Sequence, residues 1–219
     1  MTPDLFEIAD EESRTPACEP LAPGAVVLRA GALRDAPALL ADIGQVLEAA
    51  PLRHLITPGG FRMSVGMSNC GRFGWVSDPS GYRYDPLDPG TGRPWPALPA
   101  SFRRLAADAA AQAGFEHFEP DACLINRYEP GARLSLHQDR DERDLRQPIV
   151  SVSLGLPAVF QFGGLKRGDP ITRVPLQHGD VVVWGGPSRL RYHGVLAVKA
   201  GHHRLTGACR INLTFRCAM

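Results

Sequence analysis

Apolar residues recur at helical spacing in two segments of the first half of the chain. Between Asp35 and Ala50, leucine, isoleucine and valine follow one another every three or four positions, which predicts an amphipathic helix. A second helix is expected from Ser101, which would cap it, to Gly114, where the chain would leave it. A short apolar run at 25–28 precedes both helices and predicts a strand.

After Glu119 the pattern changes to short apolar runs separated by turn signals such as Glu129-Pro130-Gly131 and Gly163-Gly164. Strands are expected at 122–128, 134–138, 149–154, 158–162, 172–176, 180–184, 192–195 and 209–215. Many short strands at this spacing are typical of a jelly roll, also called a double-stranded β-helix barrel. We therefore predict an α+β fold that is mainly β, with helices before the barrel.

Two stretches do not resemble a protein core. Residues 1–23 are acidic and punctuated by proline, which predicts a loose tail. Residues 57–97 combine many glycines and prolines with several aromatic residues, which favours a structured surface flap. The expected organisation is a tail over 1–23, helices and flap over 24–118, and the barrel over 119–219.

Composition indicates the class of protein but says little about its function. The chain is 44% hydrophobic and 21% charged, as in ordinary globular domains, and its net charge of +1 favours neither nucleic acid nor membrane. The five cysteines are scattered and form no CxxC pair, so we expect reduced thiols in a cytoplasmic protein. The N-terminus lacks a signal-peptide pattern, and no apolar run is long enough for a membrane helix.

His137 and Asp139 are the first candidates for chemistry, because residues two apart on a strand face the same side and can reach one metal ion. The spacing alone is weak evidence, since His178-Gly179-Asp180 repeats it where a turn is predicted. His193 lies 54 positions beyond Asp139, far enough for the barrel to return it as a third ligand, although a packed core histidine is the alternative. Two histidines and one carboxylate leave iron with open positions for a co-substrate and oxygen.

The last expected strand carries two arginines on one face. Arg210, Asn212 and Arg216 alternate with apolar residues, so polar and apolar side chains face opposite ways. Buried arginines need an anionic partner, which a dicarboxylate would supply. A solvent-facing edge strand would show the same alternation and remains an alternative. Asn126 and Tyr128 share parity on another strand and could add neutral donors.

These segments together resemble the AlkB family of Fe(II)/2-oxoglutarate-dependent dioxygenases. The likeness runs from about residue 57 to residue 216, nearly in register, whereas the first 50 residues match only loosely. The matching motifs are Asn126-Arg127-Tyr128, Leu134-Ser135-Leu136-His137-Gln138-Asp139, Val150-Ser151-Val152-Ser153-Leu154-Gly155, Gln161-Phe162-Gly163-Gly164, Gly179-Asp180-Val181-Val182-Val183-Trp184 and the segment from Arg210 to Arg216.

The resemblance implies the cofactors Fe(II), 2-oxoglutarate and O2. The Fe(II) would be held by His137, Asp139 and His193. Arg210, helped by Tyr128, would bind the far carboxylate of 2-oxoglutarate, and Arg210 would thereby belong to the catalytic set. The end that chelates iron would be held by Asn126, Asn212 and Arg216, with Arg127 at the same co-substrate site.

The resemblance also implies how the flap meets the substrate. Trp75 would stack on a flipped, damaged base opposite the His137 ring. The negative charge of Asp141 would face the edge of a cationic base. The nucleic-acid strand itself would be contacted by Tyr82, Arg83, Tyr84 and Arg167. The alternative for the flap aromatics is a small hydrophobic cluster that closes the barrel.

The implied reaction is oxidative demethylation of 1-methyladenine or 3-methylcytosine, with release of formaldehyde, succinate and CO2. We expect alkylated single-stranded DNA as the partner, with RNA or duplex DNA as further options, and a monomer without membrane contact. One rival is an oxygenase of the same fold acting on RNA, protein or small molecules. The other is a non-catalytic nucleic-acid reader, which would have no use for a complete ligand set.

Overall fold

The computed structural model describes residues 13–219. The strands are β1 (Ala17–Ala22), β2 (Ala25–Arg29), β3 (Gly66–Gly71), β4 (Gly74–Asp78), β5 (Gly81–Asp85), β6 (Ala122–Tyr128), β7 (Leu134–His137), β8 (Ile149–Gly155), β9 (Ala158–Phe162), β10 (Thr172–Leu176), β11 (Val181–Trp184), β12 (His193–Val195) and β13 (Arg210–Arg216). The helices are α2 (Ala36–Ala49), α3 (Ala100–Gln112) and the short 3-10 helix η1 (Gly186–Ser188).

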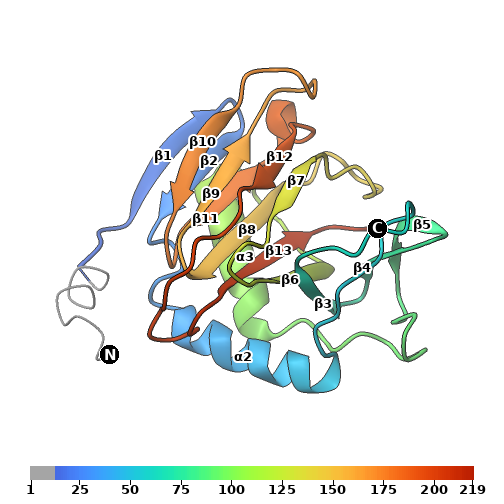
Figure 1. Cartoon of the computed structure of the whole chain (residues 1–219). Coiled ribbons are helices and arrows are strands. Elements are labelled where there is room, and N and C mark those ends of the chain that lie inside the picture. Colours follow the sequence, from blue (N-terminus) through green and yellow to red (C-terminus); the bar gives the residue numbers. More distant parts are fainter. Residues whose placement is uncertain (1–12) are drawn as a thin grey trace.

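Two sheets face each other and form the barrel (Figure 1). The major sheet has seven strands in the order β1-β2-β11-β8-β13-β6-β3, and the minor sheet has four in the order β10-β9-β12-β7. All the strand pairs that form these two sheets in the described part of the chain are antiparallel. The predicted mainly-β jelly roll is therefore confirmed, and strands from both sides of residue 119 share the major sheet.

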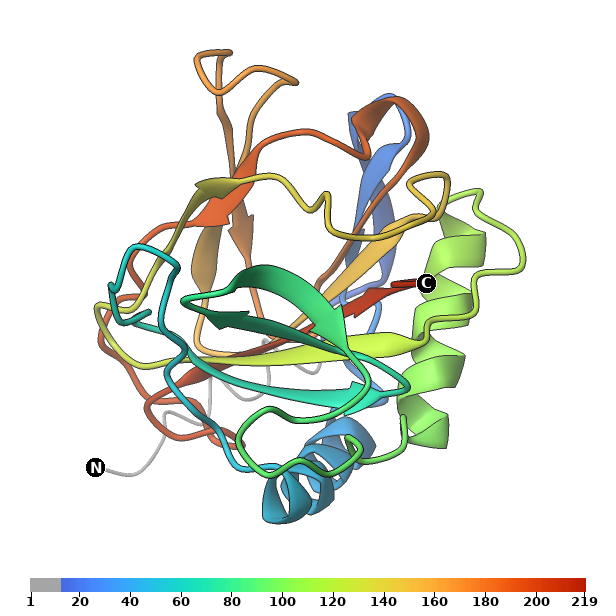
Figure 2. The ribbon, with the colours of Figure 1, turned by 90° about the vertical axis from the view of Figure 1, so that its right-hand side faces the viewer.

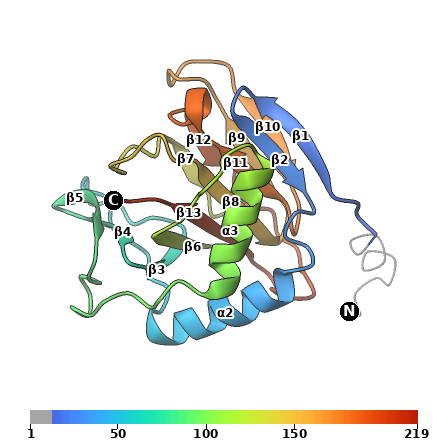
Figure 3. The same ribbon diagram turned by 180° about the vertical axis from the view of Figure 1, so that it is seen from behind.

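The core has two layers, one on each face of the major sheet. Between the sheets, Val182 and Trp184 of the major sheet pack in one cluster with Phe160 and Phe162 of the minor sheet. On the outer face, α2 and α3 cover the major sheet (Figure 3) and bury a second apolar cluster that includes Phe215. Burial of this apolar surface is the main driving force for folding. Neither of these helices is long and apolar enough to cross a membrane.

The eight strands expected after Glu119 are all present, with ends within one residue of the prediction. The helix predicted from Asp35 to Ala50 is also found, as α2. The second helix begins at Ala100, directly after Pro99, so Ser101 is not its N-cap. The Ser101 hydroxyl instead donates a hydrogen bond to Asp42 of α2 and links the two helices.

Strand β1 corrects the expected loose tail over 1–23, of which residues 1–12 lie outside the described part of the chain. β1 forms a hairpin with β2 through a turn at Gly24, whose positive φ of 73° suits glycine. The strand lies at the sheet edge, and its register shifts after Pro20. An edge position tolerates proline, and exposure on both faces removes the apolar alternation that would have marked it as a strand.

Strand β3 corrects the boundary of the expected flap over 57–97, because it is an almost wholly buried edge strand of the major sheet. The two polar residues of β3, Ser68 and Asn69, interrupt the apolar pattern by which a buried strand is recognised in the sequence. Each has a hydrogen-bond partner: the Ser68 hydroxyl donates to the Ala50 carbonyl at 2.5 Å, and the Asn69 amide binds the main chain of Trp75. The part that stands apart from the barrel is the hairpin of β4 and β5, which Figure 2 shows in front of the major sheet.

Candidate active site

Three potential metal ligands meet at one end of the minor sheet. His137 ends β7 and His193 begins β12, and the two residues are direct partners across the antiparallel pair. Asp139 lies just beyond the end of β7, rather than on the strand as expected, and still reaches the same side. One ligand atom from each residue lies within 4.8 Å of the other two, a separation that one metal ion can span.

Both histidines are oriented by hydrogen bonds on the far side of the ring. The Nδ1 atoms of His137 and His193 lie 2.8 Å and 3.0 Å from the carbonyl oxygens of Ser135 and Arg191. An Nδ1–H donor to each carbonyl leaves the lone pair on Nε2, and both Nε2 atoms point toward Asp139, at 3.5 Å and 3.7 Å. Both rings are thus presented in the form that binds a metal ion.

The charge of Asp139 is fixed by Arg216. The Arg216 guanidinium donates from Nε at 2.9 Å and from Nη2 at 2.6 Å to Oδ2 of Asp139. Burial alone would raise the pKa of Asp139, but Arg216 and the two histidines together hold that pKa well below its ordinary value. The carboxylate is therefore ionised and available as an anionic ligand.

Arg210 is a buried cation that needs an anion. Its side chain is nearly inaccessible, with its guanidinium 5.0 Å from the centre of the Tyr128 ring. Nη2 donates to the Ser153 hydroxyl, whereas Nε and Nη1 have no hydrogen-bond partner among the described residues. An unpaired buried guanidinium is costly, and a carboxylate accepting from two of its N–H groups would satisfy it. The two unpaired N–H donors, Nε and Nη1, therefore fit a carboxylate at one end of 2-oxoglutarate.

Strand pairing gathers the remaining polar residues beside Arg210. In the register of β13 with β6, Arg210 lies opposite Tyr128, and Asn212 lies opposite Asn126. The Asn126 amide donates to Asn212 at 3.2 Å, and its own Oδ1 is buried without a partner among the described residues. Because β13 is central in the major sheet, the alternative of a solvent-facing edge strand is excluded.

Arg127 is not brought to this site. It lies between Asn126 and Tyr128 on β6, so its side chain leaves the opposite face of the strand. There it is exposed and forms an ion pair with Glu129 at 2.9 Å. The structure therefore corrects its expected place beside the co-substrate.

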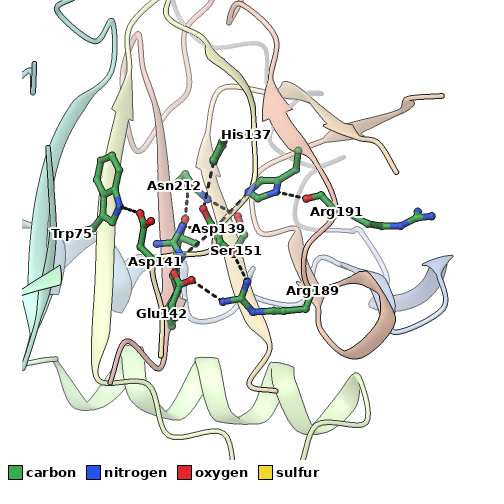
Figure 4. A network of polar contacts seen from close by, with 12 residues as sticks. Trp75, His137, Asp139, Asp141, Glu142, Ser151, Arg189, Arg191 and Asn212 are labelled. Carbon is green, nitrogen blue, oxygen red and sulfur yellow. Dashed lines mark hydrogen bonds and ion pairs between the residues drawn. The ribbon is translucent and has the colours of Figure 1, made fainter. Parts of the chain in front are cut away.

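The flap hairpin brings two of its expected contacts to the mouth of the barrel. Trp75 is half-buried, stacks on Tyr82 with ring centres 5.5 Å apart, and donates from Nε1 to Oδ2 of Asp141 at 3.0 Å. Figure 4 shows this contact beside His137 and Asp139. Arg167 is exposed nearby and donates to the Leu136 carbonyl on β7. These contacts link Trp75, Tyr82, Asp141 and Arg167 to the segment of chain that carries His137 and Asp139.

Two of the residues expected to contact the nucleic-acid strand have other partners within the protein. Tyr84 is buried, with 8% of its surface exposed, and its hydroxyl donates to Glu142 at 2.7 Å. It is therefore not a surface contact for a nucleic-acid backbone, although it shares a face of β5 with Tyr82, which is well exposed. Arg83 forms ion pairs with Asp78 and Asp85 inside the hairpin, so its charge is already balanced.

The sequence did not mark Glu142 or Arg189 as functional residues. Both side chains are almost inaccessible and form an ion pair at 3.0 Å. Glu142 lies inside the charged run Asp139-Arg140-Asp141-Glu142-Arg143-Asp144, which has the composition of a solvated loop, and Arg189 lies in another polar segment. No periodicity distinguishes them from exposed neighbours, so only the folded chain shows that they are buried.

Comparisons with known proteins agree with this geometry. Residues 25–216 match the family model of the 2OG-Fe(II) oxygenase superfamily. The chain is 61% identical to the alpha-ketoglutarate-dependent dioxygenase AlkB of Escherichia coli strain K12, over 98% of this chain and 97% of that protein. It is also 37% identical to the human nucleic acid dioxygenase ALKBH1, over 45% of this chain and 25% of that one.

A solved structure shows the same architecture. The structure of OsALKBH1 superposes with a TM-score of 0.80 at 29% sequence identity, over 91% of this chain and 99% of that one. The shared fold, the His-Asp-His cluster and the sequence identity along nearly the whole chain lead to one conclusion. The chain belongs to the 2OG-Fe(II) oxygenase superfamily and, within it, to the AlkB family of Fe(II)- and 2-oxoglutarate-dependent dioxygenases.

Proposed function

We propose that this dioxygenase repairs N-alkylated nucleic-acid bases, among them 1-methyladenine and 3-methylcytosine, by oxidative demethylation. The observation that carries the proposal is the hairpin at the mouth of the barrel, where the indole of Trp75 and the carboxylate of Asp141 lie together beside the metal-ligand cluster. An aromatic face stacks on a base, and a carboxylate suits the cationic edge of an N-methylated one.

The proposed metal ligands are His137, Asp139 and His193. With Fe(II), 2-oxoglutarate and O2 bound, the site supplies the oxidation of the N-methyl group, which leaves as formaldehyde while 2-oxoglutarate becomes succinate and CO2. The two histidines present Nε2 because their Nδ1 atoms are held by main-chain carbonyls. Arg216 keeps Asp139 ionised and fixes which of its oxygens faces the metal.

Arg210 and Tyr128 are the proposed partners of the far carboxylate of 2-oxoglutarate. The unpartnered Nε and Nη1 atoms of Arg210 support this, because both N–H groups are buried and need acceptors. We propose Asn126, Asn212 and Arg216 for the other end. The Asn212 amide is already held by Ser151 and Val152, so its contribution is to orient Asn126.

The hairpin and the adjacent loop are proposed to hold the substrate. Trp75 stacks on the flipped base across from the His137 ring, and Asp141 accepts from the edge of the base. The exposed side chains of Tyr82 and Arg167 contact the strand. Enclosure by the hairpin keeps water from the base while its methyl group is oxidised.

We further propose single-stranded DNA as the preferred substrate, because a base in a single strand needs no unpairing before it enters the site. A monomer has all the proposed residues, since every one of them comes from one chain. A cytoplasmic location fits the five free cysteines, which form no disulfide.

Formaldehyde release is the direct test. The purified chain with Fe(II), 2-oxoglutarate and ascorbate is incubated with methylated single-stranded DNA, duplex DNA and RNA of one sequence, with unmethylated strands and His137→Ala as controls. Release from methylated strands only, and fastest from single-stranded DNA, is expected. Succinate formation without formaldehyde from any methylated strand would contradict the proposal.

A further inference from the structure

Glu142 is a buried junction between three parts of the fold. Its carboxylate accepts from the Tyr84 hydroxyl on β5 at 2.7 Å and from Nη2 of Arg189, which follows η1, at 3.0 Å. It also lies 3.3 Å from Nε of Arg216 on β13. Only 2% of the Glu142 side chain is accessible, so solvent screens these contacts little.

The same two arginines hold Asp139. Arg216 binds the Asp139 carboxylate through Nε and Nη2, and Nη1 of Arg189 donates to the main-chain carbonyl of Asp139 at 2.7 Å. Arg189 also donates from Nε to the Gln147 carbonyl, so it pins the loop between β7 and β8 at both ends. The side chain and the backbone of Asp139 are therefore each fixed by an arginine that also binds Glu142. Figure 4 shows the contact of Glu142 with Arg189.

The charges of this network balance. Arg189 and Arg216 are matched by Asp139 and Glu142, and all four side chains are at most 10% accessible. Without the charge of Glu142, Asp139 would be the one carboxylate left in this network to balance the charges of Arg189 and Arg216. Arg216 would then draw Asp139 more strongly toward itself, and the carboxylate would become a poorer metal ligand.

Tyr84 connects the hairpin to this junction. Its buried hydroxyl donates to Glu142, while the main chain of Trp75 on the paired strand β4 is held by Asn69 of β3. Burial raises the pKa of Tyr84 well above its ordinary value, so the hydroxyl keeps the proton that it donates. The hairpin is thus anchored to the barrel by polar contacts from both of its strands, and the contact from β5 ends at the metal-ligand network.

We propose that Glu142 is a positioning residue for Asp139. We also propose that the hydrogen bond from the Tyr84 hydroxyl to Glu142 fixes the position of the Trp75 hairpin relative to the metal site. The first part needs only the metal-ligand cluster. The second part rests on the proposed function, because only that function gives the hairpin a substrate to align with the metal site.

Three variants test the proposal. Glu142→Gln removes the charge at nearly constant shape, and Tyr84→Phe removes one hydroxyl. Ser77→Ala is the matched control, because Ser77 is a buried residue of the same hairpin whose hydroxyl donates to the Ile56 carbonyl at 2.7 Å, away from Glu142. The readouts are the melting temperature and the anaerobic visible charge-transfer band, titrated with Fe(II) and with 2-oxoglutarate. The ratio of formaldehyde to succinate is measured with methylated strands.

Glu142→Gln is expected to weaken Fe(II) binding by about 10- to 100-fold, as is usual when a group behind a metal ligand is lost. Tyr84→Phe should weaken it less, by roughly tenfold at most, and should lower the ratio of formaldehyde to succinate. Ser77→Ala should lower the melting temperature as much as Tyr84→Phe does. Its charge-transfer band and its ratio of formaldehyde to succinate should equal those of wild type.

Wild-type Fe(II) affinity in a folded Glu142→Gln protein would overturn the positioning role. If that variant does not fold, Tyr84→Phe decides, and a band and ratio equal to those of Ser77→Ala would overturn the proposal. The Fe(II) titration needs no nucleic acid, so it stands even if wild type releases no formaldehyde. In that case the proposed substrate fails, and the role of Glu142 is still decided.

Discussion

The indole nitrogen of Trp75 donates a hydrogen bond to the carboxylate of Asp141, with Nε1 and Oδ2 3.0 Å apart. These residues come from β4 and from the loop after β7, which lie 66 positions apart in the chain. The contact makes the stacking face and the anionic group one unit. It also means that Trp75 has two separable properties, its aromatic face and its N–H donor.

Removing the aromatic face should weaken substrate binding without harming the cofactors. Trp75→Ala is expected to lose about 1–3 kcal/mol of affinity for a methylated single strand, the worth of one base–aromatic stack. Trp75→Phe keeps an aromatic face and should lose less. Fluorescence anisotropy measures the affinity, and the melting temperature shows whether Trp75 instead closes the core. A strongly destabilised Ala variant, or a stable one with wild-type affinity, would refute the stacking role.

Loss of a metal ligand should abolish turnover and leave the barrel folded. In His137→Ala or Asp139→Ala, anaerobic Fe(II) and 2-oxoglutarate should no longer give the visible charge-transfer band, because three ligands are needed to hold the ion facially. Circular dichroism checks the fold. Either variant retaining both the band and formaldehyde release would show that the metal is held elsewhere.

Arg210→Ala should raise the 2-oxoglutarate requirement while Fe(II) still binds. The variant loses charge-assisted hydrogen bonds from a buried guanidinium, which should reduce affinity roughly 100-fold or more. Titration of the charge-transfer band with 2-oxoglutarate measures this. The exposed Arg127→Ala serves as the control with wild-type affinity, because its side chain leaves the other face of the sheet. An unchanged requirement in Arg210→Ala would move the anchor to another residue.

Acid should destabilise the metal-free protein through His137. Burial and then the neighbouring His193 lower the pKa of His137 to about 4, from an ordinary value of 6.5. Between these values the unfolded chain binds the proton and the folded chain does not, so stability falls as the pH is lowered from 6.5 toward 4. Urea unfolding at pH 7 and pH 5 should show a smaller loss for His137→Gln than for wild type. Equal losses would assign the pH dependence to other groups.

Much of the fold follows from local pattern. Helix α2 and the strands after Glu119 were predictable because their apolar periodicity reports directly which face is buried. The strands β1 and β3 were not, since one is exposed on both faces and the other buries polar side chains that find partners far along the chain. Burial of such residues depends on neighbours that the local sequence does not contain.

The same division holds at the active site. The sequence by itself determined the candidate ligands His137, Asp139 and His193 and the shared face of Arg210 and Arg216, because spacing and strand parity are properties of the chain. Motif resemblance supplied the family. Only the tertiary structure decided that Tyr84 is buried and that Glu142 and Arg189 join the metal ligands to the hairpin. Those facts depend on which distant segments meet in space, and identical charged residues look alike in a sequence whether they end in solvent or in the core.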